Sequence, residues 1–374
     1  MKVLIAGDFC PQQRVAKDFE KNDFESALGE IKTIIKQADY SIVNFECPIC
    51  YGDEKPIEKC GPNLYCTEKG IEAVKWAGFN CITLANNHFF DYGEEGVRNT
   101  LKACARNNID MVGGGMNIEA SSRTLYCEIG GKKLAIINCC EHEFSIANEN
   151  HAGSNPLNPI QQYYAIKEAQ SQADYVLVIV HGGHEHYQLP SPRMQETYRF
   201  FIDAGATAVV NHHQHCFSGY ELYKGRLILY GLGNFCFDSK TIINGDWNFG
   251  YTVLLDFKDL NFQIIPYKQC SEEPTIKILD MEEREAFNLR IEELNSYIQN
   301  CQKLKQSFDN FLKKTDNDLK VVFSPYLDRI SLGACRRGLL PPLLCKQKLK
   351  MQLAYLQCES HYQRVMFFLN ERIK

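Results

Sequence analysis

The sequence has no long hydrophobic run. No apolar stretch approaches the roughly 18 residues that a membrane-spanning helix needs. The apolar part of the N-terminus, Val3 to Ala6, is too short for a signal peptide, so we expect it to be the first strand of the mature protein. Internal repeats and low-complexity tracts are also absent, which excludes a repeat architecture. We therefore expect a globular protein in the cytoplasm.

The sequence also lacks a strong charge bias. Its 374 residues include 41 Lys and Arg against 46 Asp and Glu, a net charge of -5 at pH 7. An acidic balance argues against a large nucleic-acid interface, and therefore against a nuclease. With 45% hydrophobic residues, the chain is long enough for about two domains with ample core.

An ordered cysteine pattern is missing as well. The 17 cysteines are odd in number and scattered, which favours reduced thiols over a disulfide framework. The pair Cys47 and Cys50, together with Cys60 and Cys66, leaves open a small zinc knuckle, although the second pair lacks the usual close spacing.

Histidine is not abundant, but it is concentrated. Seven of the ten histidines lie in three short motifs: His88, then His181, His184 and His186, and finally His212, His213 and His215. The last group follows the apolar run Ala206 to Val210, which is typical of a buried strand. A lone histidine here would indicate an ordinary polar loop. Three at one strand end favour a metal site, because neutral imidazole is a good ligand for borderline metals.

Other predicted strands also end in polar residues. Asp8 follows the first strand, Glu46 the second, Asn87 and His88 a third, and His181 the strand from Tyr175 to Val180. In α/β folds this edge of the sheet is where ligands bind. Carboxylates, imidazoles and one amide suit two divalent ions, Mn, Fe or Zn, that share a bridging carboxylate and activate a water. A histidine beside a ligand but free of the metal can protonate a leaving group.

The chain changes character after about Pro266. Met281 to Lys314 is charged and has helical periodicity, and Ser331 to Lys374 is predicted to be helical after Pro341 and Pro342. Six basic residues and no acidic one lie from Arg329 to Lys350. We consider two roles for this part. Either its leucines (Leu339, Leu340, Leu343, Leu344, Leu353) pack on the main domain and the bases are solvated, or the basic helices dock a partner protein or an anionic polymer.

In this order, the motifs resemble those of the capsule-synthesis protein CapA family, also called the poly-γ-glutamate biosynthesis family. That family is itself similar to the calcineurin-like metallophosphoesterases. The resemblance covers roughly residues 1–257, and the segments that carry it are Gly7-Asp8, Asn44 to Pro48, Leu84 to His88, Asp91 to Gly93, Gly113 to Gly115, His181 to Glu185, Ala204 to Ala206, His212 to His215 and Tyr230 to Phe235.

The resemblance implies an α/β fold, a four-layer α-β-β-α sandwich with metals at the carboxyl ends of the strands. We therefore expect a metallophosphoesterase-like domain over residues 1–265 and a helical extension over 275–374. The implied metal ligands are Asp8, Glu46 (bridging), Asn87, His181, His213 and His215, with His88 as the catalytic acid. We assign substrate binding to Glu185, His184 and Asn234.

Some positions depart from the family pattern. Asn211 and Gln214 stand where the family usually has Gly and Pro, and His184 and His186 are additional. Cys10 stands where the wider group usually places a ligand histidine, so a thiolate ligand is an option there. Capsule-system members usually carry an N-terminal membrane anchor, which is not seen in this sequence.

Two functions remain open from the sequence. The first is a metal-dependent hydrolase of a phosphoester, or of an amide in a γ-glutamyl or similar anionic polymer. The second is a non-enzymatic assembly or binding factor that keeps the fold. A scaffold needs none of the predicted site residues, so the sequence favours the enzyme, while the fold does not choose the substrate.

Overall fold

Two β-sheets, stacked face to face, form the centre of the computed structural model, which describes residues 1–239, 241, 244–315, 330, 339 and 345–373. In the first sheet four strands run parallel and three antiparallel strands continue it, in the order β16-β15-β14-β1-β2-β3-β4. A further strand, β13, pairs with the carboxyl end of β1. The bounds are β1 (Lys2–Phe9), β2 (Tyr40–Phe45), β3 (Cys81–Thr83), β4 (Asp110–Val112), β13 (Asn234–Cys236), β14 (Phe249–Asp256), β15 (Asn261–Gln269) and β16 (Ile276–Ile278).

The second sheet has the order β11-β12-β10-β9-β7-β6. Its four central strands are parallel, and β6 and β11 are antiparallel edges. The strands are β6 (Leu125–Ile129), β7 (Lys132–Cys140), β9 (Tyr175–His181), β10 (Ala208–His212), β11 (Tyr220–Tyr223) and β12 (Arg226–Leu229). A two-stranded ribbon is formed by β5 (Gly114–Gly115) and β8 (Gly153–Ser154).

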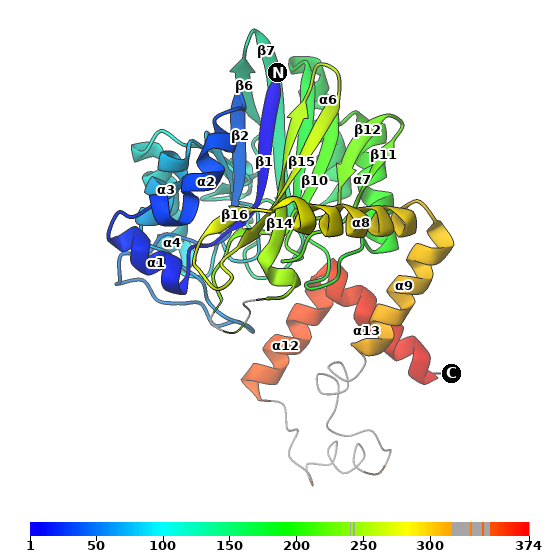
Figure 1. Ribbon diagram of the computed structural model, residues 1–374. Coiled ribbons are helices and arrows are strands. Elements are labelled where there is room, and N and C mark those ends of the chain that lie inside the picture. Colours follow the sequence, from blue (N-terminus) through cyan, green and yellow to red (C-terminus); the bar gives the residue numbers. More distant parts are fainter. Residues whose placement is uncertain (240, 242–243, 316–329, 331–338, 340–344, 374) are drawn as a thin grey trace.

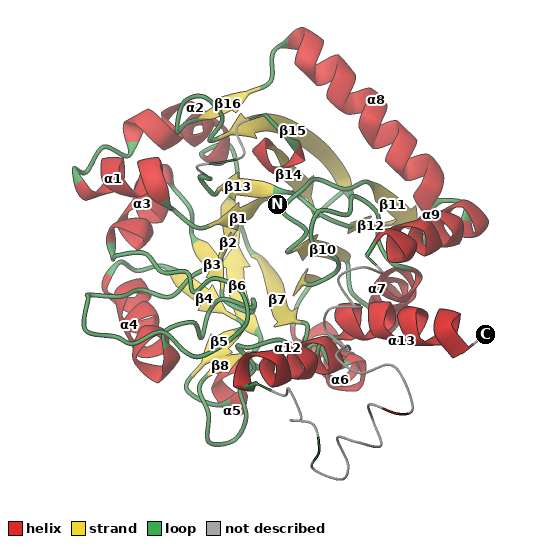
Figure 2. Ribbon diagram, turned by 90° about the horizontal axis from the view of Figure 1, so that it is seen from below, coloured by secondary structure: helices red, strands yellow, loops and turns green. Residues whose placement is uncertain are grey.

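Helices cover both outer faces (Figure 2). One group packs on the first sheet: α1 (Gln13–Glu20), α2 (Glu25–Ile35), α3 (Lys69–Ala77) and α4 (Gly93–Arg106). On the second sheet lie α6 (Pro159–Gln172) and α7 (Pro192–Ala204), and the short α5 (Ile118–Ser121) contacts β5. A single 3-10 turn, η1 (Asp246–Asn248), precedes β14.

The alternation of side chains along β1 produces these layers. Leu4 and Ala6 pack under the helices α1 to α3, whereas Val3 and Ile5 belong to the core between the two sheets. Successive side chains of a strand point to opposite faces, so an unbroken apolar run can fill two layers. The predicted four-layer α-β-β-α sandwich is confirmed.

The helices α6 and α7 both begin at a capping side chain followed by proline. The amide groups of Ile160 and Gln161 donate to the side chain of Asn158, and Pro159 follows this cap. Ser191 caps α7 in the same way, followed by Pro192. Asn and Ser caps followed by proline are helix-start signals that periodicity alone misses.

The C-terminal part contains four described helices: α8 (Met281–Ile298), α9 (Cys301–Lys314), α12 (Lys346–Gln357) and α13 (Glu359–Ile373). The first of them belongs to the sandwich, because its buried face packs against Phe217 and Tyr251; this face comprises Phe287, Ile291, Leu294 and Ile298. The first sheet also continues through β16, beyond residue 265. The division into a main domain over residues 1–265 and a helical extension over 275–374 stays a prediction.

The other helices gather at the end of the sandwich away from the N-terminus (Figure 1). Leu339 and Leu353 are 73% and 54% exposed, so the expectation that they pack on the main domain is wrong for these two. Pro341, Pro342 and the other leucines of that expectation lie outside the described residues. In the part of the chain that the structure describes, no helix is both long and apolar enough to cross a membrane.

Candidate metal centre

Two buried carboxylates meet at the carboxyl end of the first sheet. Asp8 lies in β1 opposite Asn44 of the parallel strand β2, and Glu46 directly follows β2. Asn44 Nδ2 donates to Asp8 Oδ1 at 2.7 Å. The strand β1 comes very close to the chain before β13, because a Cβ on Gly7 would lie 1.9 Å from the carbonyl oxygen of Gly233. Only glycine fits at this position.

The second sheet contributes three histidines to the same place. His181 ends β9, and His213 and His215 follow the neighbouring strand β10. Both residues after β10 have positive φ angles, 95° for His213 and 55° for His215. This conformation is unfavourable for residues other than glycine, and it is characteristic of functional sites. The amide of His213 donates to Asp8 Oδ2 at 3.2 Å, which joins the two sheets.

These residues form two groups of ligand atoms that share Glu46. One group is Asp8, Glu46 and His215, the other Glu46, His181 and His213, and within each group the ligand atoms lie within 4.8 Å of one another. Glu46 Oε1 lies 3.4 Å from His181 Nε2 and 3.9 Å from His215 Nε2. Asn87 Oδ1 lies 3.0 Å from His181 Nε2. All six residues predicted to bind metal therefore converge.

The electrostatics of Glu46 fit a cation. Neither carboxylate oxygen has a hydrogen-bond partner among the described residues, although the side chain is fully buried. Burial and the neighbouring Asp8 raise the pKa of Glu46 well above its ordinary value. A buried carboxylate without partners is costly, and a divalent cation removes that cost.

The pKa values of Asp8 and His181, the neighbours of Glu46, are both lowered. Burial raises the pKa of Asp8, but His212, His181 and His215 outweigh it and hold that pKa below its ordinary value. Burial and the nearby His213 lower the pKa of His181. Ionised carboxylates and neutral imidazoles are the forms that bind metals, so the donor set suits two divalent ions.

His88 lies beside the predicted metal ligands, but its side chain contacts a different pair of residues, Asp91 and Lys59. Its Nδ1 is 2.6 Å from Asp91 Oδ2, and the buried Lys59 forms an ion pair with Asp91 and lies 3.2 Å from the same nitrogen. The amide of Leu64 also donates to Asp91 Oδ2 at 2.7 Å. A carboxylate at Nδ1 fixes the ring and the position of its proton. Asp91 and Lys59 were not among the predicted site residues, although Asp91 stands three residues after His88, just before a helix begins.

The three residues predicted to bind substrate occupy different environments. Glu185 is surrounded by histidines, and their charge outweighs burial to lower its pKa to about 2. His184 is buried, which lowers its pKa to about 3, and its ring contacts Phe308 and Phe311 of α9. Asn234 Oδ1 lies 2.9 Å from His215 Nδ1, and its amide nitrogen donates to two backbone carbonyls. Asn234 is therefore placed to orient His215.

His212 is a further residue that sequence reasoning left without a role. Its Nδ1 lies 3.4 Å from Asp8 Oδ1, and it has no hydrogen-bond partner in the described part of the chain. The three adjacent histidines could not be told apart by spacing, since the turn after β10 decides which imidazoles face the carboxylates.

Two cysteine expectations are not supported by the geometry. Cys10 Sγ lies 3.3 Å from Gln12 Nε2, and it belongs to neither ligand group. Cys47, Cys50, Cys60 and Cys66, all of them described, do not gather as a metal-binding set either.

A cavity of about 420 Å³ opens beside these residues. Its lining combines site residues with the C-terminal helices: Lys59, Cys60, Asn87, His88, Glu143, His184, Glu185, His186, Phe311, Met351, Tyr355, His361 and Arg364 are among them. The volume is typical of a site for a small ligand or for one end of a larger one. The C-terminal helices therefore form one wall of the pocket.

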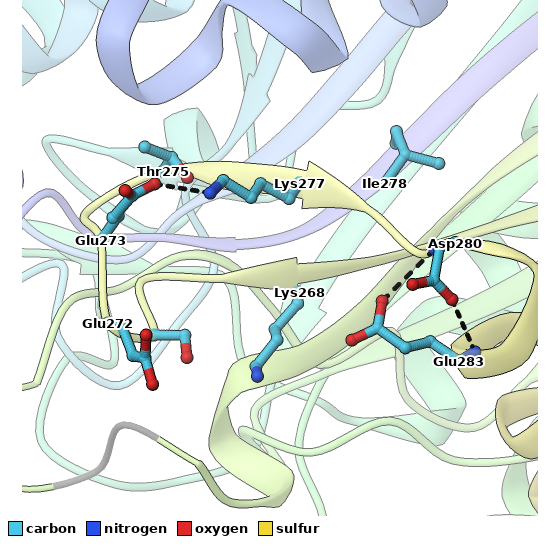
Figure 3. Close-up of a pocket in the computed structure, with 9 residues that line it drawn as sticks. Lys268, Glu272, Glu273, Thr275, Lys277, Ile278, Asp280 and Glu283 are labelled. Atoms are coloured by element: carbon cyan, nitrogen blue, oxygen red, sulfur yellow. Dashed lines mark hydrogen bonds and ion pairs between the residues drawn. The ribbon is translucent and has the colours of Figure 1, made fainter.

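A second depression of about 430 Å³, whose lining includes none of the site residues described above, lies between the ends of β15 and β16 and the start of α8 (Figure 3). Two of its charged side chains form an ion pair, Lys277 with Glu273 at 2.5 Å, and Glu283 accepts from the backbone amide of Asp280 at 3.3 Å. Histidine and cysteine are absent from its described lining. We interpret it as a solvated groove at the edge of the sheet.

The site therefore belongs to an α/β protein with a two-sheet sandwich covered by helices and with carboxylates and imidazoles gathered at its strand ends. The chain belongs to the family described as "Bacterial capsule synthesis protein PGA_cap", whose profile matches residues 2–239.

Curated relatives agree with the family. The chain is 30% identical to "Capsule biosynthesis protein CapA" of Bacillus anthracis over 295 residues, 75% of this chain and 71% of that protein. It is 32% identical to "PGA biosynthesis protein CapA" of Bacillus subtilis (strain 168) over 241 residues, 64% of this chain and 63% of that protein. A "Probable polyglutamine synthesis accessory protein" of Mycobacterium tuberculosis is 25% identical, with 59% of this chain and 62% of that protein covered.

Solved structures are more distant. A hypothetical protein from Thermus thermophilus matches with a TM-score of 0.45 and 17% identity, covering 71% of this chain and 98% of that one. A putative 5'-nucleotidase from Staphylococcus aureus matches with a TM-score of 0.42 and 13% identity, covering 78% and 58%.

Proposed function

We propose that this protein is a metal-dependent hydrolase with a dinuclear centre that cleaves a phosphoester or an amide bond in an anionic, polyglutamate-type substrate. The observation that carries the proposal is the pair of ligand groups that share the buried, unpartnered carboxylate of Glu46. A shared carboxylate between two ion sites is the arrangement that dinuclear hydrolases use.

Each ligand has a defined place in the proposed centre. Asp8 and His215 would hold one ion, His181, His213 and Asn87 the other, and Glu46 would bridge them. Such a pair of divalent ions supplies an activated water and polarises the bond to be cut. Asn234 orients His215 through the contact at Nδ1, which is the usual way in which a second residue fixes a ligand imidazole.

His88 would act as the general acid. Asp91 accepts from Nδ1 and fixes the orientation of the ring, which leaves Nε2 to donate a proton to the leaving group. Lys59 forms an ion pair with the buried carboxylate of Asp91. Glu185 lies among the histidines of the same pocket, where an ionised carboxylate can orient a donor group of the substrate.

The substrate class is supported by the names of the relatives, which are linked to capsule and PGA biosynthesis. The pocket lining includes the carboxylates of Glu143 and Glu185, but also imidazoles and the cationic side chains of Lys59 and Arg364, which could contact an anionic group.

Metal analysis and a substrate panel test the proposal. We expect one to two equivalents of Mn, Fe or Zn in the purified protein and metal-dependent hydrolysis of at least one phosphoester or γ-glutamyl substrate. His213→Ala should lose metal and turnover together. Full metal retention in both His213→Ala and Glu46→Ala would remove the dinuclear site.

A non-enzymatic assembly or binding factor is the second candidate. The relative from Mycobacterium tuberculosis bears the words "synthesis accessory protein", which favours it. The two candidates differ in one measurement. A binding factor would hold metal and retain a polyanion, yet show no turnover on any member of the panel, and His88→Ala would leave polymer binding unchanged.

A further inference from the structure

A second set of metal-binding side chains lies between the sandwich and the last helix. Glu143 belongs to the loop after β7, Cys358 lies between α12 and α13, and His361 is in the first turn of α13. One ligand atom from each of the three lies within 4.8 Å of the others. Two of the three residues follow residue 239, where the family match ends, so the family does not account for this set.

The surroundings of Cys358 are unusual for a buried thiol. Its Sγ lies 3.6 Å from Glu143 Oε1 and 3.7 Å from Glu141 Oε2, and the residue is 0% exposed. Buried cysteines normally pack among apolar side chains. A thiol between two carboxylates makes few apolar contacts there. The negative charge of the carboxylates would instead favour a bound cation.

His361 supplies an independent indication. Its Nδ1 is buried and has no hydrogen-bond partner among the described residues, while its ring stacks on Tyr355 at 4.9 Å. The stacking therefore fixes the ring, while Nδ1 has no hydrogen-bond partner among the described residues. Buried polar atoms without partners are rare and call for an explanation such as a missing ion.

The start of α13 is held against the same loop by other contacts. Ser360 donates to Glu141, and Glu359 pairs with His142 and accepts from its amide at 2.9 Å. The three candidate ligands are thus carried by segments that are already fixed to each other, which is what a metal site requires.

We propose that Glu143, Cys358 and His361 bind one further divalent ion, of the borderline class to which Zn²⁺ belongs, separate from the pair bridged by Glu46. A thiolate, an imidazole and a carboxylate are typical zinc ligands, and three protein ligands leave one position for water or a substrate oxygen. Glu143 Oε1 is also 3.9 Å from His213 Nε2, so the ion would lie next to the main centre.

The consequence is a pocket wall that metal binding would stabilise further. The ion would tie α13 to the loop after β7, and with it the wall formed by α12 and α13. This inference goes beyond the proposed function, because it concerns metal binding and the order of two helices, and it needs no turnover.

Cobalt titration of the full-length protein tests it. Cobalt bound to a thiolate shows a charge-transfer absorption that cobalt bound to carboxylates and imidazoles lacks, and the two ligand groups around Glu46 contain no cysteine. We expect the band in the wild type and in Cys301→Ser, whose thiol is exposed on α9, and its loss in Cys358→Ser. His361→Ala should weaken the affinity of this ion by more than about tenfold and covers the case in which Cys358→Ser does not fold.

A second measurement separates this site from the main centre. Glu46→Gln should lose ions of the main centre and retain the thiolate band. Zn²⁺ should slow proteolysis within α12 and α13 in the wild type but not in His361→Ala. Absence of the band in the wild type, or its persistence in Cys358→Ser with unchanged affinity in His361→Ala, would overturn the further site and leave the proposed function untouched.

Discussion

Glu46 is the side chain on which the proposed centre depends, and its effect on stability should change sign with metal. In the metal-free protein its burial beside Asp8 raises its pKa, so the ionised form destabilises the fold increasingly as pH rises above the unfolded value of 4.5. Glu46→Gln removes that penalty. We expect the melting temperature of the variant to equal or exceed that of the wild type without metal.

With saturating metal the order should reverse, because only the wild type gains stability from binding the ions. Thermal unfolding with chelator and with added metal measures both states. A variant that is less stable than the wild type in both would show that Glu46 acts through packing, and not through its charge.

His88 and Asp91 should affect turnover and leave metal content unchanged. Loss of a general acid typically costs two to four orders of magnitude, and we expect His88→Ala to lower kcat by roughly 10²- to 10⁴-fold. Asp91→Asn keeps the size of its side chain but removes the carboxylate that orients the ring through Nδ1, so kcat should fall while metal content stays unchanged. If His88→Ala loses metal as readily as His213→Ala, the residue is a ligand.

Much of this centre could be predicted from the sequence, because each ligand stands at the end of an apolar run. Asp8, Glu46, His181 and His213 need only the rule that parallel strands present their carboxyl ends at one edge. Lys59 could not be predicted this way, since it comes from a loop without periodicity. Cys358 and His361 were missed because nothing local in the sequence indicates that a helix more than 200 positions later returns to the loop at Glu143.

At the level of elements, the loop after β7 is fixed by one buried carboxylate that joins three segments. Glu141 pairs with Arg193 of α7 and accepts from Ser360 of α13. Burial raises its pKa, but Arg193 and Ser360 outweigh burial and lower it to about 2. The contact should therefore stabilise the fold above the unfolded pKa of 4.5 and lose this contribution as pH falls through about 2.

The corresponding prediction concerns Glu141→Gln. The difference between 4.5 and about 2 corresponds to about 3 kcal/mol at neutral pH. We expect the free energy of unfolding of the wild type to fall more than that of Glu141→Gln between about pH 6 and about pH 3. Denaturant titrations at both pH values measure this, with the exposed Glu119→Gln as the control. Parallel pH profiles for wild type and Glu141→Gln would contradict the assignment.

The limits of sequence reasoning at this scale have a physical cause. Strands with strict alternation or continuous apolar runs, such as β1 and β9, were predicted. The single helical stretch predicted from Met281 to Lys314 is in fact α8 and α9, because Asn300 caps a new helix by accepting from the amides of Gln302 and Lys303. A capping residue inside a segment can end one helix and begin another while the apolar residues keep their helical spacing. Periodicity alone therefore does not show the break.

On the scale of the whole molecule, the part of the chain from α8 onward has two regions with different roles. The four buried side chains of α8 should each contribute about 1.5–3 kcal/mol, and their sum is comparable to the whole free energy of unfolding of a typical domain. Truncation after Ile278, which removes α8, should therefore leave a chain that aggregates or unfolds. Circular dichroism and size-exclusion chromatography measure this outcome, and a soluble, folded product would contradict it.

Truncation after Lys314 should have the opposite result, a chain that still folds. It keeps α8 and α9 and removes α12 and α13, which line the pocket but leave Leu353 exposed. We expect a folded protein that retains the ions of the main centre, because none of their ligands is removed. The pocket then loses one wall, including Arg364, and with it a cationic side chain placed to hold an anionic chain beyond the bond that is cut. KM should rise for long polyanionic substrates and change little for short ones, and the salt dependence of KM should weaken. Equal changes in KM for short and long substrates would mean that the two helices shape the reactive centre itself, and do not serve as an extended binding surface.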